Sequence, residues 1–71
     1  LGMEPLRKWR EGAGTSAANA GSAVGVSKVH WLRLESGERA VTAEMAVKIE
    51  RLTGIPRETL RPDIFKERAG A

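Results

Sequence analysis

Apolar residues recur every three or four positions along this chain, which is the spacing of an amphipathic α-helix. The alternation typical of a β-strand never persists for more than a few residues. The pattern predicts helices at about 5–12, 16–24, 28–36, 43–53 and 57–61, with a last turn over 62–65. The fold class that we expect is therefore all-α, with five helices.

Residues that start or end helices stand at these boundaries. Pro5 suits the first position of a helix, where its missing N–H costs nothing. Gly12 and Gly14 would end this helix, and Thr15 or Ser16 would cap the next one. The residues at helical spacing in the first helix are Leu6, Trp9, Arg10 and Ala13, and the inward positions of the fourth are Met45, Ala46, Ile49 and Leu52.

The stretch from Ser16 to Gly37 has the pattern of two short helices joined by a tight turn. Gly25 can take the positive φ that closes a helix, and Val26 can fill the corner. Ser27 can cap the following helix through its hydroxyl. This arrangement predicts a helix-turn-helix.

The second helix would turn small residues inward, namely Ala17, Ala20, Gly21 and Val24. On the third helix, Trp31 shares a face with Leu34 and Glu35. We expect the large indole of Trp31 to fill the volume that the small residues leave, because an unfilled cavity in a core is costly.

The composition limits the classes of function. The 71 residues suit one domain, which we place at 3–66, with Leu1 and Gly2 as a cloning remnant and 67–71 as a flexible tail. The chain contains no cysteine and one histidine, so it offers no thiolate metal site and no Cys–His nucleophile pair. No glycine pattern matches a nucleotide-binding loop. We therefore expect no enzyme, no catalytic residues, no metal and no other cofactor.

Charge and hydropathy indicate which kind of partner and which cellular compartment to expect. Twelve Lys and Arg against nine Asp and Glu give a net charge of +3 and an isoelectric point near 10.0. This mild excess favours a polyanion as partner. No apolar run approaches the roughly 18 residues of a membrane span, and no signal peptide is recognisable. We expect a soluble, cytoplasmic protein with no membrane partner.

From the turn onward, the sequence contains a known motif, formed by G-V-S at 25–27, Trp31, L-E at 34–35 and Gly37. In these positions the chain resembles the helix-turn-helix regulators of the Cro/phage-repressor (XRE-like) class. The segment GIPRETLRPDIF at 54–65 is similar to the ending of the YdaS-like antitoxin/Cro subgroup. The resemblance implies a lambda-repressor-like DNA-binding domain whose third helix enters the major groove.

The third helix would present an outward face opposite Trp31 and Leu34. Two cationic and two branched apolar residues would lie there, namely Lys28, Val29, Leu32 and Arg33. Arg and Lys can bind guanine, and apolar side chains can contact thymine methyl groups, so we expect these four residues to read bases. The candidates for contacts with the DNA backbone are Thr15, Ser16, Ser27, His30, Arg39 and Thr42. The resemblance also implies an ion pair between Arg10 and Glu35.

These features predict a sequence-specific transcription regulator that binds double-stranded DNA, as a bacterial or prophage repressor. A homodimer through the C-terminal helices would use the apolar residues Ile55, Leu60, Ile64 and Phe65, although closure of the core would use them as well. The alternative is an antitoxin-like protein-interaction module, whose surface at Val29 and Leu32 would meet a protein such as a toxin.

Overall fold

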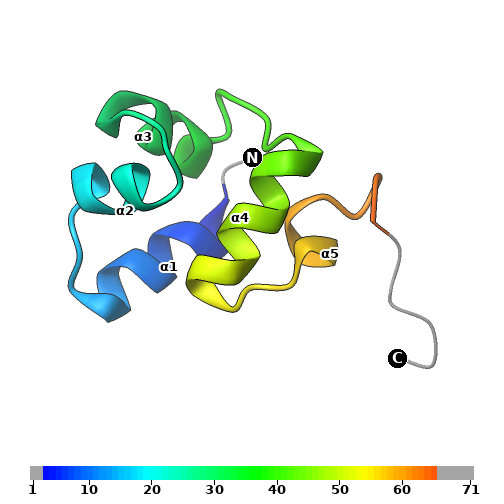
Figure 1. Ribbon diagram of the computed structural model, residues 1–71, viewed down its shortest axis with the longest axis horizontal. Coiled ribbons are helices and arrows are strands. Elements are labelled where there is room, and N and C mark those ends of the chain that lie inside the picture. Colours follow the sequence, from blue (N-terminus) through cyan, green and yellow to red (C-terminus); the bar gives the residue numbers. More distant parts are fainter. Residues whose placement is uncertain (1–2, 66–71) are drawn as a thin grey trace. The chain divides into compact units, whose positions relative to one another are not determined.

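The computed structural model describes residues 3–65, and within them the chain forms five α-helices and no strand (Figure 1). The all-α class predicted from the sequence is confirmed. The chain divides into two compact units, the first ending at Ala40 and the second beginning at Val41. The expected cloning remnant at 1–2 and the expected tail at 67–71 lie outside the described residues.

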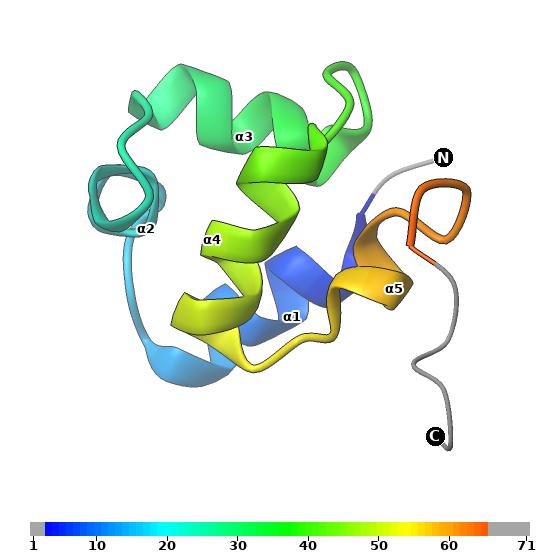
Figure 2. The same cartoon turned by 45° about the vertical axis from the view of Figure 1, so that its right-hand side comes forward.

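The first unit contains α1 (Glu4–Ala13), α2 (Ala17–Ala23) and α3 (Lys28–Ser36). In Figure 2, α2 is seen nearly along its axis while α3 runs across the view, so the two helices cross steeply. Residues 24–27 form the turn between them, where the sequence predicted it. Because α1 begins one residue earlier than predicted, Pro5 occupies its second position rather than its first.

Backbone hydrogen bonds and one side-chain cap build the turn between α2 and α3. Gly25 has φ 82°, a left-handed conformation that a residue with a Cβ rarely adopts. The hydroxyl of Ser27 accepts a hydrogen bond from the N–H of His30 at 3.1 Å and so caps α3. The N–H of Val26 donates to the carbonyl of Gly21 at 2.8 Å, which ties the turn back to α2.

From the sequence, we expected the small size of Gly21 to leave volume for Trp31, but in the structure it serves another purpose. A Cβ at this position would lie 2.8 Å from the carbonyl oxygen of Val26 and 2.9 Å from that of Ser27. Cβ atoms do not approach backbone atoms so closely without displacing them. The prediction that Gly21 leaves volume for Trp31 is therefore wrong, because the missing side chain lets the backbone of the turn approach α2.

Within the first unit, the side chains of Trp31, Leu6 and Leu34 are completely buried. Trp9 of α1 adds a second indole, whose ring centroid lies 6.4 Å from that of Trp31 with the planes tilted by 57°. Aromatic pairs favour such tilted arrangements over face-to-face stacking. Ala13, the last residue of α1, shares the helical spacing of these residues but is exposed.

The second unit contains α4 (Ala43–Thr53) and α5 (Arg57–Leu60). Thr42 caps α4 as predicted, because its hydroxyl accepts a hydrogen bond from the N–H of Met45 at 3.1 Å. Ala46 and Ile49 are completely buried, and Met45 is half-buried. The prediction that Leu52 faces inward is wrong, since it is 36% exposed. Leu52 lies roughly 90° around the helix from the midpoint of Ala46 and Ile49.

The chain after α5 forms the predicted last turn without becoming a helix. The N–H groups of Ile64 and Phe65 both donate to the carbonyl of Arg61, at 3.1 and 2.9 Å. Arg61 donates through Nε and Nη2 to the two carboxylate oxygens of Asp63, at 2.8 and 2.7 Å, and this contact lowers the pKa of Asp63 to about 2. Its Nη1 donates to the carbonyl of Val41. Arg61 thereby connects the last turn to the beginning of the second unit.

Candidate nucleic-acid interface

Glu35, near the end of α3, joins the helices of the first unit. Arg10 of α1 donates two hydrogen bonds to its carboxylate, from Nε to Oε2 at 2.6 Å and from Nη2 to Oε1 at 3.1 Å. The structure thus brings together the pair that the resemblance implied. The indole Nε1 of Trp31 donates to Oε2 at 2.5 Å, and the N–H of Met3 donates to the Glu35 carbonyl at 2.8 Å. The side chains of Arg10, Trp31 and Glu35 form the Glu35 hub, which fixes α3 against α1.

The surroundings of Glu35 keep its carboxylate charged. Burial by itself would raise the pKa of Glu35, but the hydrogen bonds from Arg10 and Trp31 outweigh it and lower the pKa below the ordinary value of 4.5. The hydrogen bond to Glu35 raises the pKa of Arg10 in turn. Sequence reasoning missed Trp31 as a partner of this pair. Its i, i+4 spacing from Glu35 on one helix is the signal that could have found it.

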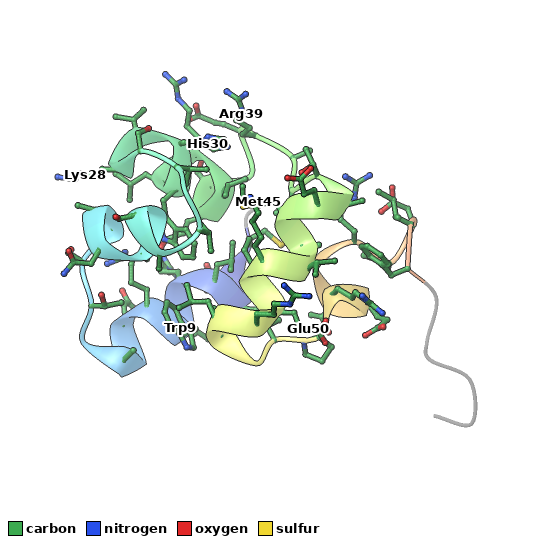
Figure 3. The ribbon with its side chains drawn as sticks, viewed as in Figure 1. Trp9, Lys28, His30, Arg39, Met45 and Glu50 are labelled. Carbon is green, nitrogen blue, oxygen red and sulfur yellow. The ribbon has the colours of Figure 1, made fainter. Side chains whose placement is uncertain are left out.

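The opposite face of α3 is open to solvent. Val29 is 54% exposed, as is the side chain of Arg33, and both lie roughly opposite Trp31 and Leu34 around the helix. These two residues are one helical turn apart and form a row, with an apolar group toward the start of α3 and a cation toward its end. Lys28 projects from the first turn of the same helix (Figure 3).

Leu32 lies on a different side of α3 from this row. It is 39% exposed, and it lines an open depression of about 420 Å³ together with Glu4, Arg7, Glu35 and Ser36. At about 100° per residue, Lys28 and Leu32 share one edge of the helix, whereas Val29 and Arg33 share another. The four residues predicted to read bases therefore occupy two neighbouring rows of α3.

The helix N-termini of the first unit carry groups that suit an anion. Ser16 caps α2 by accepting a hydrogen bond from the N–H of Asn19 at 3.0 Å, and Ser27 caps α3 in the same way. Each hydroxyl keeps its own hydrogen to donate, and the first N–H groups of a helix have no partner inside it. Together with the helix dipole, these donors can bind a phosphate. Thr15 and His30 lie beside them and are half-buried.

Arg39 and Thr42 lie on either side of the boundary between the two units. Arg39 is exposed beyond the end of α3 (Figure 3), and its N–H donates to the carbonyl of Arg33 at 3.2 Å. Thr42 belongs to the second unit, where its hydroxyl caps α4. Arg39 therefore belongs to the same unit as α3 and is bonded to the end of that helix. Thr42 is the N-cap of a helix in the other unit.

A family model described as a helix-turn-helix domain matches residues 4–62, a range that includes all five helices. The chain belongs to this helix-turn-helix family. The family is part of the Cro-like class that the motif at 25–37 resembles, and the all-helical domain is of the lambda-repressor-like kind. No curated protein and no solved structure matches the chain.

As a helix-turn-helix protein, the chain is a DNA-binding regulator, and proteins of this family are typically not enzymes. Its place in the YdaS-like subgroup stays a prediction. Among residues 3–65, no three acidic or histidine side chains come together as a metal site would require. No helix in the same part of the chain is both long enough and apolar enough to cross a membrane.

Sequence reasoning about the helix-turn-helix also missed Glu38, a carboxylate beside the row of Val29 and Arg33. Its Oε2 lies 3.8 Å from Nε of Arg33, and both side chains are exposed. Glu38 follows the end of α3, so the helical spacing that identifies ion pairs along a helix does not apply to it. Only the path of the chain after Gly37 brings the carboxylate next to Arg33.

Proposed function

We propose that this protein is a sequence-specific transcription regulator that reads the major groove of double-stranded DNA with α3. The observation that carries the proposal is the two-sided character of α3. One face is buried and held by the Glu35 hub, and the other presents Val29 and Arg33 to solvent. A helix that is held rigidly on one side loses little conformational entropy when its other side binds base edges. The major groove of B-DNA admits such a helix.

Each exposed side chain of α3 suits a feature of the groove. The guanidinium of Arg33 can donate to O6 and N7 of a guanine, and Val29 can contact a thymine methyl group. Lys28 can donate to a guanine near the start of the helix, and Leu32 adds an apolar contact at the neighbouring edge. Arg39 and the capped N-termini of α2 and α3 would bind phosphates, which positions the protein without reading sequence.

We further propose a repressor of bacterial or prophage origin that binds as a homodimer. A small domain that occupies a site on DNA can block transcription by occupancy alone, and the resemblance to phage repressors supports this role. In the second unit, Leu52 and Ile64 are apolar and are 36% and 45% exposed, so they are candidates for a dimer contact. The sequence suggested Ile64 for that surface but not Leu52, and it also suggested Leu60, which is buried. A two-fold dimer would bind half-sites about 34 Å apart.

Selection of bound sequences from random duplex DNA at two salt concentrations tests the proposal. We expect a half-site consensus, repeated as an inverted pair if the protein is a dimer. The affinity should fall steeply with salt, with a logarithmic slope of about 0.9 for each phosphate contacted. A pool that shows no enrichment at either salt concentration would contradict sequence-specific binding.

Two arginine variants separate base reading from phosphate binding. Arg33→Ala should cost about 1 to 3 kcal/mol on the selected duplex and relax the preference at one base pair, with little change on a scrambled duplex. Arg39→Ala should weaken binding to both duplexes alike and lower the salt slope by about one. Lys8→Ala removes an exposed cation of α1 and serves as the control. If Arg33→Ala lost the same affinity on both duplexes, Arg33 would contact a phosphate rather than a base.

An antitoxin-like protein-interaction module is the second candidate, favoured by the exposure of Val29 and Leu32. A protein partner, such as a toxin, would cover these apolar groups instead of DNA. Salt distinguishes the two functions, because an apolar protein contact depends little on ionic strength, whereas contacts with several phosphates depend on it strongly. A salt-insensitive complex that is lost in Val29→Ser would favour the module.

A further inference from the structure

The segment that follows α3 is folded tightly onto the end of this helix. The hydroxyl of Ser36 donates to the carbonyl of Arg33 at 3.1 Å and accepts from the N–H of Glu38 at 3.3 Å. The N–H of Arg39 donates to the same carbonyl at 3.2 Å. Gly37 makes the reversal with φ 86°. These bonds hold the backbone of Glu38 beside Arg33, so its carboxylate is positioned by local structure.

The carboxylate of Glu38 meets Arg33 at one edge of the guanidinium. Its Oε2 is 3.8 Å from Nε, which is the distance of an ion pair rather than of a hydrogen bond. Both side chains are exposed, and Nε is the nitrogen of Arg33 that makes this close approach to Glu38. The two terminal nitrogens form a fork of their own that can donate parallel hydrogen bonds to a guanine. A guanine bound end-on, through the terminal nitrogens, would therefore leave Nε of Arg33 beside Glu38.

We propose that Glu38 is a specificity-determining residue that lets Arg33 bind a guanine and keeps it from phosphates. The proposal rests on the proposed function, because it requires α3 to read DNA. A guanine can bind the terminal nitrogens while Nε stays beside Glu38. A phosphate competes with the Glu38 carboxylate for the same cation and is repelled by its negative charge. Glu38 therefore weakens binding to random DNA more than binding to the cognate site.

The test compares Glu38→Gln with the wild-type protein on two duplexes, the selected site and a scrambled one. The Gln side chain keeps the size of Glu38 and removes its charge. We expect the affinity for the scrambled duplex to rise about two- to fivefold, the factor that an exposed ion pair is worth. On the selected duplex, the affinity should change by less than about twofold. The salt slope on the scrambled duplex should rise by about one.

Two further variants show whether Glu38 acts through Arg33. In an Arg33→Ala background, Glu38→Gln should no longer change the ratio of the two affinities. Glu11→Gln removes an equal charge from an exposed position of α1, and it should leave that ratio unchanged in the wild-type background. Thermal melts of all variants report whether each one is folded, and we expect Glu38→Gln to melt like the wild type.

The outcomes separate this inference from the proposed function. If Glu38→Gln shifts both affinities equally, or changes their ratio in the Arg33→Ala background as well, Glu38 acts only as a general charge and the inference is wrong. If the wild-type protein does not distinguish the selected duplex from the scrambled one, the proposed function itself is overturned, and the inference with it.

Discussion

Two arginine–carboxylate pairs, one in each unit, use the same chemistry in different surroundings. Arg10 and Glu35 are 25 residues apart and join α1 to α3, and the side chain of Glu35 is only 7% exposed. Arg61 and Asp63 are two residues apart in one turn, and the side chain of Asp63 is 64% exposed. In both pairs, Nε and Nη2 of the arginine bind the two carboxylate oxygens, and the pKa of the acid is lowered.

The two pairs differ in the other groups that contact each carboxylate. Glu35 also accepts the indole N–H of Trp31, so its loss would leave a buried donor and a half-buried guanidinium without an acceptor. Asp63 has no such buried donor in its pair with Arg61, and solvent can replace its oxygens. Stability should therefore follow burial rather than the number of hydrogen bonds.

The largest expected effect belongs to the pair in the Glu35 hub. Glu35→Ala should lower the free energy of unfolding by about 3 kcal/mol, because it strands Arg10 and the Trp31 N–H in a site with little solvent. Urea denaturation of Glu35→Ala, Arg10→Ala and the double variant forms a thermodynamic cycle. Losses that simply add would mean that the two side chains do not stabilise each other.

A smaller effect is expected when only the indole N–H is removed. Trp31→Phe keeps an aromatic ring near Trp9 and deletes the donor to Glu35, so it should cost about 1 kcal/mol for the hydrogen bond together with a packing term. In the Glu35→Ala background the indole N–H has no acceptor to lose, so the same substitution should cost less there than in the wild type. Equal losses in the two backgrounds would show that the hydrogen bond contributes nothing measurable.

Acid should weaken the protein mainly through Glu35. Its pKa lies below 4.5 in the folded state, so the unfolded chain binds a proton first as the pH falls. The stability contribution is complete above pH 4.5 and is lost as the pH falls through the folded-state pKa. Urea midpoints measured below pH 5 should depend less on pH in Glu35→Gln than in the wild type. An unchanged slope would locate the acid sensitivity elsewhere.

The smallest effect is expected for the exposed pair. The pKa of Asp63 falls from 3.8 to about 2, so its contribution would also be lost on acidification across that range, but solvent screens it. Asp63→Asn should leave the thermal midpoint near that of the wild type, whereas Arg61→Ala should lower it more, because it also removes the bond to the Val41 carbonyl. A loss for Asp63→Asn as large as that for Glu35→Ala would refute the argument from burial.

The boundaries of the helices could be predicted because their causes are local. Ser27 and Thr42 cap helices through bonds to residues three positions ahead, and Gly25 takes its positive φ from the turn in which it lies. The outward position of Val29 and Arg33 follows from helical spacing alone. The bases that these side chains would contact remain predictions, as does the role of Arg39.

The errors occurred at the turn between two helices and where one helix face is only partly covered. Periodicity placed Leu52 inward, but the buried side of α4 is a narrow stripe centred on Ala46 and Ile49. Small size at Gly21 suggested spare volume, whereas the space beside it holds the backbone of the turn. In both cases helical spacing gave the direction of the side chain correctly but could not show what lies next to it.

The sequence by itself determined the all-α class, the helix-turn-helix, its caps and the two faces of α3, because each depends on residues within about one helical turn. The family motif added the pairing of Arg10 with Glu35. Only the tertiary structure decided that the backbone of the turn needs a glycine at 21 and that Glu38 lies beside Arg33. These contacts depend on how the chain reverses between helices, and a spacing pattern within one helix carries no information about that reversal.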